Sequence, residues 1–516
     1  MPVMKQIVRM CGVFLVIYAL LSPSADAQTP LTILHTSEHH GTIQPLEGGA
    51  YAGSGGVARR ATLIAQIRKE LDHVLVVDSG DLLIGSVLSA VFRGEADISA
   101  MNLMGYDAVA VGNHDFDFGV DHLKKLASQA KFPFLCTNVR PRIPDVCQRF
   151  AIKQVGTLRV ALLGLIGEAS YRDTFNRAAL QDLSFQDPTV AVRDAIAELR
   201  EQAEVIVAIT HQTTEEDLAL ARTIPTLDVI IGGHTPGFDG LVTPDHLKPA
   251  IGRVELVGGG PLFVKTHRQG RTLGRLDLLY HDRTIMVAEA RNLPVDASVP
   301  ADPGMSNLIE RYLQQLDKET RRLAGYSEVT FEGDSDVIRT RETNLGNLLA
   351  DLARRDTGAE IALINAGAIR GSIASGPVTY RHLMELLPFD SSLSLVAVRG
   401  TQIRAALENS VSRLPQPNGR FLQVSGLRYS VDPAAPVGSR VSDILVNGVA
   451  LDPERVYSVT VTRFIAEGGD GYGVLLNTAS KHLDVPLRDL LAKAFEAGPL
   501  TASGGVPRIM TGGPGF

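Results

Sequence analysis

Short apolar runs alternate with amphipathic stretches through the first half of the chain. The runs are rich in β-branched residues and typical of buried strands: "TILHT", "HVLVVDSGD", "DAVAVGN", "RVALLGLIG", "EVIVAIT" and "LDVIIGG". Segments with the apolar spacing of surface helices lie between them, such as "VARRATLIAQIRKEL" and "TVAVRDAIAELREQ". This alternation, from residue 30 to about residue 280, predicts an α/β domain of layered sheets and helices.

Polar residues gather at the points where these strands end. Five successive strand ends carry Glu38 with His40, Asp81, Asn113, His211, and His234. Taken singly, each has an ordinary explanation, because aspartate and glycine form turns and asparagine caps helices. Strand ends in α/β sheets are, however, where functional sites form, and five in one domain are not expected by chance. We therefore interpret these residues as a metal site.

The types of ligand indicate the chemistry. Carboxylate, imidazole and amide oxygen suit divalent Zn, Mn, Co, Fe or Mg, and the pattern offers no thiolate. Asp81, at the centre, can bridge two ions with its two oxygens. Two ions about 3.5–4 Å apart clamp a phosphoryl group and lower the pKa of a shared water, so that hydroxide attacks in line. His114 is expected to point into the site, with Asp117 holding its other ring nitrogen, and to protonate the leaving oxygen.

A second unit follows a segment rich in Pro, Asp and Ser, "DASVPADPGMS" at residues 296–306. The next stretch, "NLIERYLQQLDKETRRL", predicts a linking helix, and the remainder predicts an α+β unit. Eleven of the 13 histidines precede residue 294, so metal chemistry belongs to the first half. The predicted division is a signal peptide at 1–27, a metal-binding domain at 28–295, a linker with its helix at 296–325, and a second domain at 326–516.

The first residues predict export. Lys5 and Arg9 precede a short apolar core, "MCGVFLVIYALL", and "ADAQ" offers a cleavage site after Ala27. The core is short for a membrane span, although a retained anchor is the alternative. We expect a periplasmic or secreted protein without stable membrane insertion after cleavage.

The net charge limits the classes of binding partner, and the cysteines indicate how the chain could be cross-linked. Without the signal segment the chain has a net charge of −8, which favours neither a nucleic-acid polymer nor an anionic membrane surface. Cys136 and Cys147 remain after cleavage and could pair across a short loop in an exported chain. Their spacing matches no zinc module.

The motifs resemble a known family. The series "HTSEHHG", "VVDSGD", "AVGNHDFDFG", "ITHQ" and "IGGHT" resembles the calcineurin-like binuclear metallophosphatases. The second half resembles the C-terminal domain of the 5′-nucleotidase / UDP-sugar hydrolase family. The resemblance covers essentially the whole mature chain. It implies a layered N-terminal β-sandwich flanked by helices, a linking helix and a C-terminal α+β nucleotide-binding domain.

The same resemblance assigns roles to residues. It implies two divalent ions, the first held by Glu38, His40 and Asp81, the second by Asp81, Asn113, His211 and His234. It makes His114 and Asp117 the catalytic pair.

Two departures fall on the first metal site. The family has aspartate where Glu38 stands, and the longer side chain would shift the ion or bind it through both oxygens. The family also has histidine or glutamine two residues after His234, where this chain has Pro236. Proline offers no side-chain ligand, so water, a backbone carbonyl or another residue must complete the site. The candidates are His39, Asp239 and His246.

The resemblance also implies a nucleotide pocket in the second half. Its residues are Arg339 and Arg370 for the phosphate or the polar end of the substrate, Asn365 for ribose or phosphate, Phe389 and Phe464 for stacking on the base, and Asp470 for ribose hydroxyls. By default two phenylalanines are core residues, and only their place within matching motifs favours binding. The family commonly has asparagine where Ser391 stands, which leaves the recognition of the base edge open.

These observations predict an exported 5′-nucleotidase that acts on a small nucleotide as a monomer or dimer. Other activities on the same scaffold are the alternatives: a 2′,3′-cyclic nucleotide phosphodiesterase, a UDP-sugar diphosphatase, or the related thiosulfohydrolase. The Phe389–Phe464 pair argues against the last, which needs no base stack. A binding protein without turnover is the alternative from another class. Pro236 favours it, and the retained His114–Asp117 pair argues against it.

Overall fold

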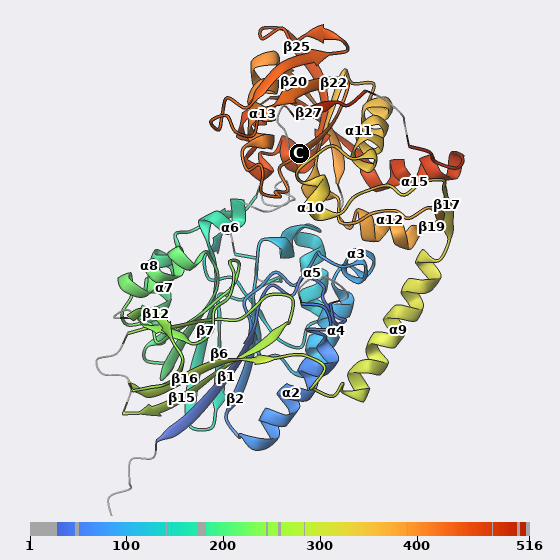
Figure 1. Ribbon diagram of the computed structural model, residues 1–516. Coiled ribbons are helices and arrows are strands. Elements are labelled where there is room, and N and C mark those ends of the chain that lie inside the picture. Colours follow the sequence, from blue (N-terminus) through green and yellow to red (C-terminus); the bar gives the residue numbers. More distant parts are fainter. Residues whose placement is uncertain are drawn as a thin grey trace, which may run out of the picture.

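The computed structural model describes residues 28–511, apart from residues 47–50, 141, 144, 173–181, 244–245, 256–259, 283, 390, 477 and 503–505. The predicted signal segment therefore lies outside the described residues. The chain forms an N-terminal domain, blue to green in Figure 1, and a C-terminal domain, orange to red. Helix α9 (Pro303–Thr320) runs between them.

Among the described residues, the N-terminal domain contains two sheets of seven strands each. In spatial order the first consists of β13 (Gly252–Glu255), β16 (Thr284–Pro294), β15 (Thr272–His281), β1 (Thr29–Thr36), β2 (Val74–Asp78), β3 (Ala108–Ala110) and β4 (Phe134–Leu135). The second consists of β12 (His246–Ala250), β11 (Leu241–Thr243), β14 (Leu262–Lys265), β10 (Val229–Gly232), β9 (Val205–His211), β7 (Leu158–Ile166) and β6 (Phe150–Val155). Strands β1 to β4 run parallel to one another, as do β7, β9, β10 and β14.

The two sheets pack face to face because their strands are apolar on both sides. Leu31 and Ile33 of β1 share the core between the sheets with Val207 and Ile209 of β9. Leu34 belongs to the core on the outer face of the first sheet. Strands buried on both faces read as continuous apolar runs, which is the pattern in the sequence.

Helices cover both outer faces. The first sheet is covered by α2 (Val57–Glu70), α3 (Val87–Phe92), α4 (Glu95–Met104), α5 (Val120–Gln129) and α9, and the second by α7 (Pro188–Leu199) and α8 (Thr214–Thr223). Helix α6 (Glu168–Arg172) follows β7, and β5 (Val139–Arg140) pairs with β8 (Ser184–Phe185). The expected layered β-sandwich flanked by helices is confirmed.

The linking helix is fixed to the N-terminal domain. Its first turn is capped by Asp302, whose side chain accepts a hydrogen bond of 2.7 Å from the backbone N–H of Met305, and proline occupies the first helical position. Met305 and Leu316 are buried in the core under the first sheet. Its last turns reach the second domain, where Asp317 lies 3.5 Å from Arg381.

The C-terminal domain is an α+β unit around one core. Its larger sheet consists of β21 (Leu422–Ser425), β18 (Ile361–Asn365), β25 (Val456–Thr462), β20 (Ser392–Arg399) and β26 (Ala479–Pro486). A second sheet consists of β24 (Val449–Ala450), β23 (Val441–Val446), β22 (Leu427–Val431) and β27 (Ile509–Thr511), and β17 (Leu323–Ser327) pairs with β19 (Gly376–Thr379). The helices are α10 (Ser335–Ile338), α11 (Asn344–Thr357), α12 (Tyr380–Leu386), α13 (Gly400–Val411), α14 (Arg463–Ala466) and α15 (Leu487–Ala497).

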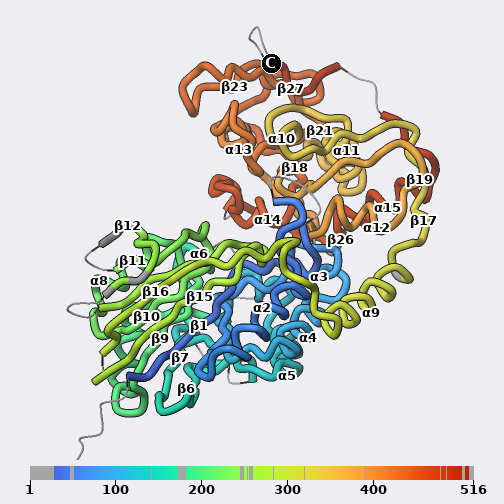
Figure 2. Tube along the Cα trace, turned by 60° about the horizontal axis from the view of Figure 1, so that its bottom comes forward, coloured from blue at the N-terminus to red at the C-terminus, as the bar shows by residue number. Residues whose placement is uncertain are grey.

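The two domains face each other across the edge of the sandwich. Helix α3 of the N-terminal domain lies against α12 of the C-terminal domain, as Figure 2 shows. The second domain thereby covers the edge at which β1, β2, β3, β9 and β10 end.

Two further expectations bear on export. Cys136 and Cys147 form a disulfide across a sequence separation of 11 residues. Within the part of the chain that the structure describes, no helix combines the length and the apolar character needed to cross a bilayer.

Candidate metal centre and substrate cleft

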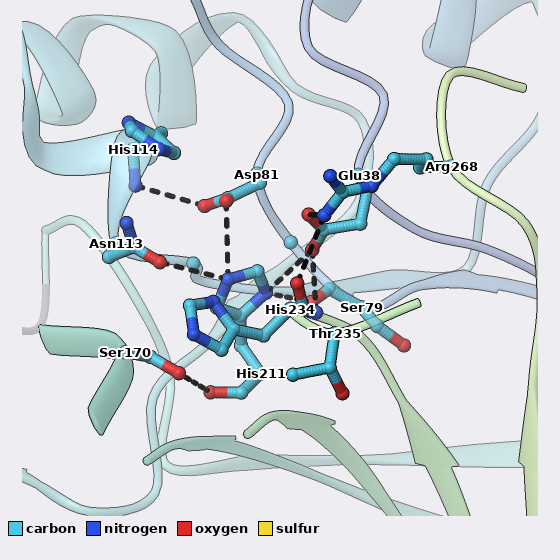
Figure 3. Close-up of polar contacts among 12 residues, drawn as sticks. Glu38, Ser79, Asp81, Asn113, His114, Ser170, His211, His234, Thr235 and Arg268 are labelled. Atoms are coloured by element: carbon cyan, nitrogen blue, oxygen red, sulfur yellow. Dashed lines mark hydrogen bonds and ion pairs between the residues drawn. The ribbon is translucent and has the colours of Figure 1, made fainter. Parts of the chain in front are cut away.

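The residues predicted as metal ligands meet at strand ends contributed by both sheets (Figure 3). They form two groups that share one aspartate: Glu38, His40 and Asp81 in the first, and Asp81, His211 and His234 in the second, each with ligand atoms within 4.8 Å of one another. Asn113 joins the second group, because its Oδ1 lies 3.0 Å from His211 Nε2. This is the arrangement that two ions bridged by a carboxylate require.

Backbone carbonyls orient two of the histidines. The Nδ1 atom of His40 lies 3.0 Å from the carbonyl oxygen of Ile84, and that of His211 lies 2.8 Å from the carbonyl oxygen of Ser79. A donated N–H at Nδ1 leaves Nε2 directed at a carboxylate of the site, 3.3 Å from Glu38 Oε2 for His40 and 3.3 Å from Asp81 Oδ2 for His211. Protein metal sites fix the ring and tautomer of a ligand in this way. The donor set therefore fits divalent ions.

The loops that carry these ligands are strained. The backbone φ angle is positive at Glu38 (53°), His40 (48°), Asp81 (58°) and His234 (61°). Non-glycine residues in this region are uncommon, and each costs about 1–3 kcal/mol that the surrounding structure must offset. Strain at four neighbouring site residues indicates that their positions are set by function.

Asp115 holds two loops of the site in place through hydrogen bonds to their backbone. Its carboxylate accepts hydrogen bonds from the backbone N–H groups of Asp81 (3.1 Å), Leu82 (2.9 Å) and Gly112 (2.8 Å). It thereby ties the loop after β2 to the loop after β3. Asp115 stands between His114 and Asp117 in the sequence, but no local pattern there reveals this role.

Close approach of the same two loops depends on glycine. A Cβ atom at Gly112 would lie 2.3 Å from Asp81 Oδ1 and 2.4 Å from its backbone nitrogen. A Cβ atom at Gly80, where φ is 90°, would lie 2.6 Å from the nitrogen of Gly112. Larger residues at either position would push Asp81 out of place.

Neighbouring charges set the protonation states of the buried groups in the site. Burial and Asp81 would raise the pKa of Glu38, but the hydrogen bond to His40 and the charge of His211 lower it to about 2. Burial alone would raise the pKa of Asp81, whereas His211 and His114 hold it well below its usual range. Both carboxylates are therefore ionised. Burial and the charge of His211 lower the pKa of His234 to about 4, so this ring is neutral and able to ligate.

His114 and Asp117 form the expected pair. His114 Nδ1 lies 2.6 Å from Asp117 Oδ2, and the backbone N–H of His114 donates to Asp81 Oδ1 at 2.9 Å. Burial alone would lower the pKa of His114, but the charges of Asp81 and Asp117 raise it to about 9. The imidazole therefore carries a proton at neutral pH and has the charge that a general acid needs.

Of the candidates for the ligand missing at Pro236, two lie elsewhere. His39 Nε2 lies 3.0 Å from Asp97 and its Nδ1 lies 3.3 Å from Arg60, so both ring nitrogens are engaged inside the domain. Asp239 contacts His267 and Asn292. The side chain of His246 lies outside the described residues.

Arg268 is a site residue that the sequence argument did not predict. It lies in the loop between β14 and β15, and its Nη2 donates to Glu38 Oε2 at 3.0 Å and to the carbonyl oxygen of His234 at 3.1 Å (Figure 3). Its 230-residue separation from Glu38 leaves no local pattern that could have revealed the pair.

The substrate residues predicted in the C-terminal domain also lie together. The carboxylate of Asp470 accepts from Asn365 Nδ2 at 3.1 Å, and the Arg370 guanidinium lies 4.8 Å from the centre of the Phe389 ring. Loss of hydration and the charge of Arg339 lower the pKa of Arg370 to about 10. Both arginines therefore face the cleft as close, like charges.

One cavity of about 1120 Å³ joins the two halves of the site. The predicted residues that line it are Glu38, His40, Asp81, Asn113, His114 and His234 from the first domain, and Arg370, Phe389, Phe464 and Asp470 from the second. An adjoining cavity of about 630 Å³ is lined by Asp117, Arg339 and Asn365. His211 is fully buried and is not among the residues that line either cavity.

Comparison with known proteins finds one family model in each half of the chain. Residues 31–238 match the family of calcineurin-like phosphoesterases, and residues 323–477 match the 5′-nucleotidase C-terminal domain. The chain is 30% identical to human 5′-nucleotidase over 90% of its own length and 87% of the human protein. It is 28% identical to the trifunctional nucleotide phosphoesterase YfkN of Bacillus subtilis, over 88% of this chain but only 33% of that longer protein.

A solved structure extends the comparison to the fold. The 5′-nucleotidase precursor of Thermus thermophilus is similar with a TM-score of 0.72 and 32% identity, covering 94% of this chain and 99% of that one. The fold and the site therefore define a metallophosphoesterase, a hydrolase with a calcineurin-like domain. Within that class, the chain belongs to the 5′-nucleotidase family.

We predict that Gly112→Ala weakens the binding of divalent metal by about 10–100-fold, because the added methyl group displaces Asp81, which both ligand groups share. Metal content after dialysis, measured by mass spectrometry, checks this. Gly473→Ala is a suitable control, because a Cβ atom there meets no atom within 4 Å. Full metal content in the Gly112 variant would contradict the close approach.

Proposed function

We propose that this protein is an exported 5′-nucleotidase that releases inorganic phosphate from nucleoside 5′-monophosphates. The observation that carries the proposal is the shared cavity, whose lining includes candidate metal ligands of one domain and the two phenylalanines of the other. A nucleotide has its phosphate at one end and its base at the other, so it matches a cleft with these two unlike walls. The family membership supports the same class of substrate.

The phosphate end of the substrate would lie at the metal ligands. The two groups that share Asp81 would hold two divalent ions, which when bound would supply a Lewis acid and lower the pKa of bound water. His114, protonated and held by Asp117, is positioned to donate a proton from Nε2 to the leaving 5′-oxygen. Asp117 accepts the N–H at Nδ1 and so orients the ring, which leaves the proton at Nε2 as the one to be transferred.

The second domain supplies anion and base recognition. Arg339 and Arg370 repel each other, and the buried Nε of Arg339 has no hydrogen-bond partner among the described residues. An anionic group between them would offset the repulsion of the two positive charges and would accept a hydrogen bond from Arg339 Nε. Guanidinium groups bind phosphate and carboxylate through paired donors. Phe389 and Phe464 offer faces for a base, and Asp470, held by Asn365, offers an acceptor for ribose hydroxyls.

Export is part of the proposal. The basic and apolar N-terminal segment and the Cys136–Cys147 disulfide support it, because disulfides persist in oxidising compartments. We expect the mature chain, isolated from the periplasm or the medium of an expressing cell, to begin at Gln28. N-terminal sequencing by mass spectrometry checks this, and an intact Met1 on the exported chain would contradict cleavage.

We predict that the metal-loaded protein releases phosphate from AMP and that His114→Ala lowers kcat by about 10²–10⁴-fold, because the leaving oxygen loses its proton donor. His281→Ala, at the end of β15, is the matched control and should keep full activity. The assay measures phosphate with added Mn²⁺, Zn²⁺ or Co²⁺. Parallel assays with 2′,3′-cyclic nucleotides and UDP-sugars test the other esters, and turnover of those alone would overturn the proposal.

We predict a separate effect for the base pocket. Phe464→Ala should raise KM for AMP by roughly 5–100-fold, since stacking contributes about 1–3 kcal/mol per base. KM for ribose 5-phosphate, which has no base, should change little. Equal losses for both substrates would show that Phe464 has only a structural role.

A further inference from the structure

Arg268 reaches the first metal group from the lining of the main cavity. Its Nη2 bridges Glu38 Oε2 at 3.0 Å and the carbonyl oxygen of His234 at 3.1 Å, and so joins the loop after β1 to the loop after β10. The Glu38 side chain is 3% exposed, whereas that of Arg268 is 42% exposed and lines the main cavity. The guanidinium thus reaches into the site from the cleft (Figure 3).

Glu38 is already engaged through both oxygens. Its Oε1 accepts the backbone N–H of His234 at 2.6 Å, and its Oε2, paired with Arg268, also lies 3.3 Å from His40 Nε2. A divalent ion in the first group therefore has to share or take the oxygen that Arg268 holds. Arginine cannot relieve this conflict by losing its proton.

Among the described residues, no arginine or lysine pairs with Asp81, the carboxylate of the second group. Its ligands are Asp81, Asn113, His211 and His234, and Arg268 contacts only the backbone of the last. The first group is also poorer in ligands. Among the described residues, its set contains Glu38, His40 and Asp81, and the chain has Pro236 where a fourth side-chain ligand would come from.

The position of Arg268 has an electrostatic cause. Its buried Nε has no hydrogen-bond partner among the described residues, so the attraction of Glu38 holds the side chain although one donor stays unsatisfied. An ion that takes Glu38 removes this attraction. Because the side chain is partly exposed to the cavity, it has room to move away.

We propose that Arg268 competes with the first divalent ion for Glu38, so that the two metal sites have unequal affinity. The second site binds its ion tightly, and the first binds weakly and exchanges. The inference rests on the proposed metal site but not on the substrate, because it concerns ion binding in the absence of any nucleotide. A single fixed charge beside a divalent ion in a partly buried site changes its affinity by tenfold or more.

The test is calorimetric titration of the metal-stripped mature chain with Mn²⁺, with bound metal counted independently by mass spectrometry. The wild type should bind one ion tightly and a second at least tenfold more weakly. Arg268→Ala should tighten the second event by about tenfold or more and leave the first unchanged. Arg268→Gln should do the same, because it keeps hydrogen-bond donors but removes the charge.

The control is Arg291→Ala, which removes an arginine of similar exposure that pairs with Asp277 on the same domain. It should bind as the wild type does, and thermal melting confirms that each variant is folded. Two equally tight ions in the wild type, or no tightening in the alanine variant, would overturn the proposal. Tightening in the alanine variant alone would also overturn it, because competition by charge requires the same effect from glutamine. Failure to hydrolyse AMP would overturn the proposed function and leave this measurement intact.

Discussion

Face-to-face packing of the two sheets is the constraint on which the site depends. The core between them fixes β1, β2 and β3 of one sheet against β9 and β10 of the other, with Ile33 and Ile209 both fully buried there. Ligands that follow strands of different sheets can then meet at one edge. A single sheet would place its strand ends in a row, whereas the sandwich gathers them into a cluster around Asp81. The apolar interface between the sheets is therefore what allows two carboxylates and several imidazoles to stay close together.

The negative charges of that cluster are balanced by positively charged side chains of the site itself. Glu38, Asp81 and Asp117 bring three carboxylates to the site, and the protonated His114 and the guanidinium of Arg268 face them. Burial would lower the pKa of His211, but Asp81 raises it to about 10, so without a bound ion this ring adds a third positive charge, and an ion at Nε2 would take the place of that proton. Buried carboxylates without such partners would be protonated or would unfold the loops. The backbone anchors act together with this balance, because Asp115 holds the loops at the spacing that the charges need.

The site residues that could be predicted from the sequence are those that belong to a local sequence pattern. Strand ends were identifiable because a buried apolar run has a clear limit, and Glu38, His40, Asp81, Asn113, His211 and His234 all follow such runs. The layered fold followed from the alternation of elements. Sheet order did not, because β15 returns antiparallel beside β1 from more than 200 residues away. Arg268 and Asp115 were missed for a related reason: their roles depend on backbone groups and on a loop contact, and neither leaves a periodic signal.

The cavity has two walls of opposite character, and this couples metal binding to anion binding. The carboxylates of Glu38 and Asp81 lie on one side, and the guanidinium of Arg370 lies on the other. A phosphate ester is attracted to the arginine wall whatever the state of the metal site. On the opposite wall His114 and Arg268 already face the carboxylates, and bound divalent cations would add further positive charge there. Because the effect of an ion on the ester equals the effect of the ester on the ion, a phosphate that spans the cleft must in turn hold the ions more tightly. The group poorest in ligands, the one around Glu38 and His40, would gain most from that coupling.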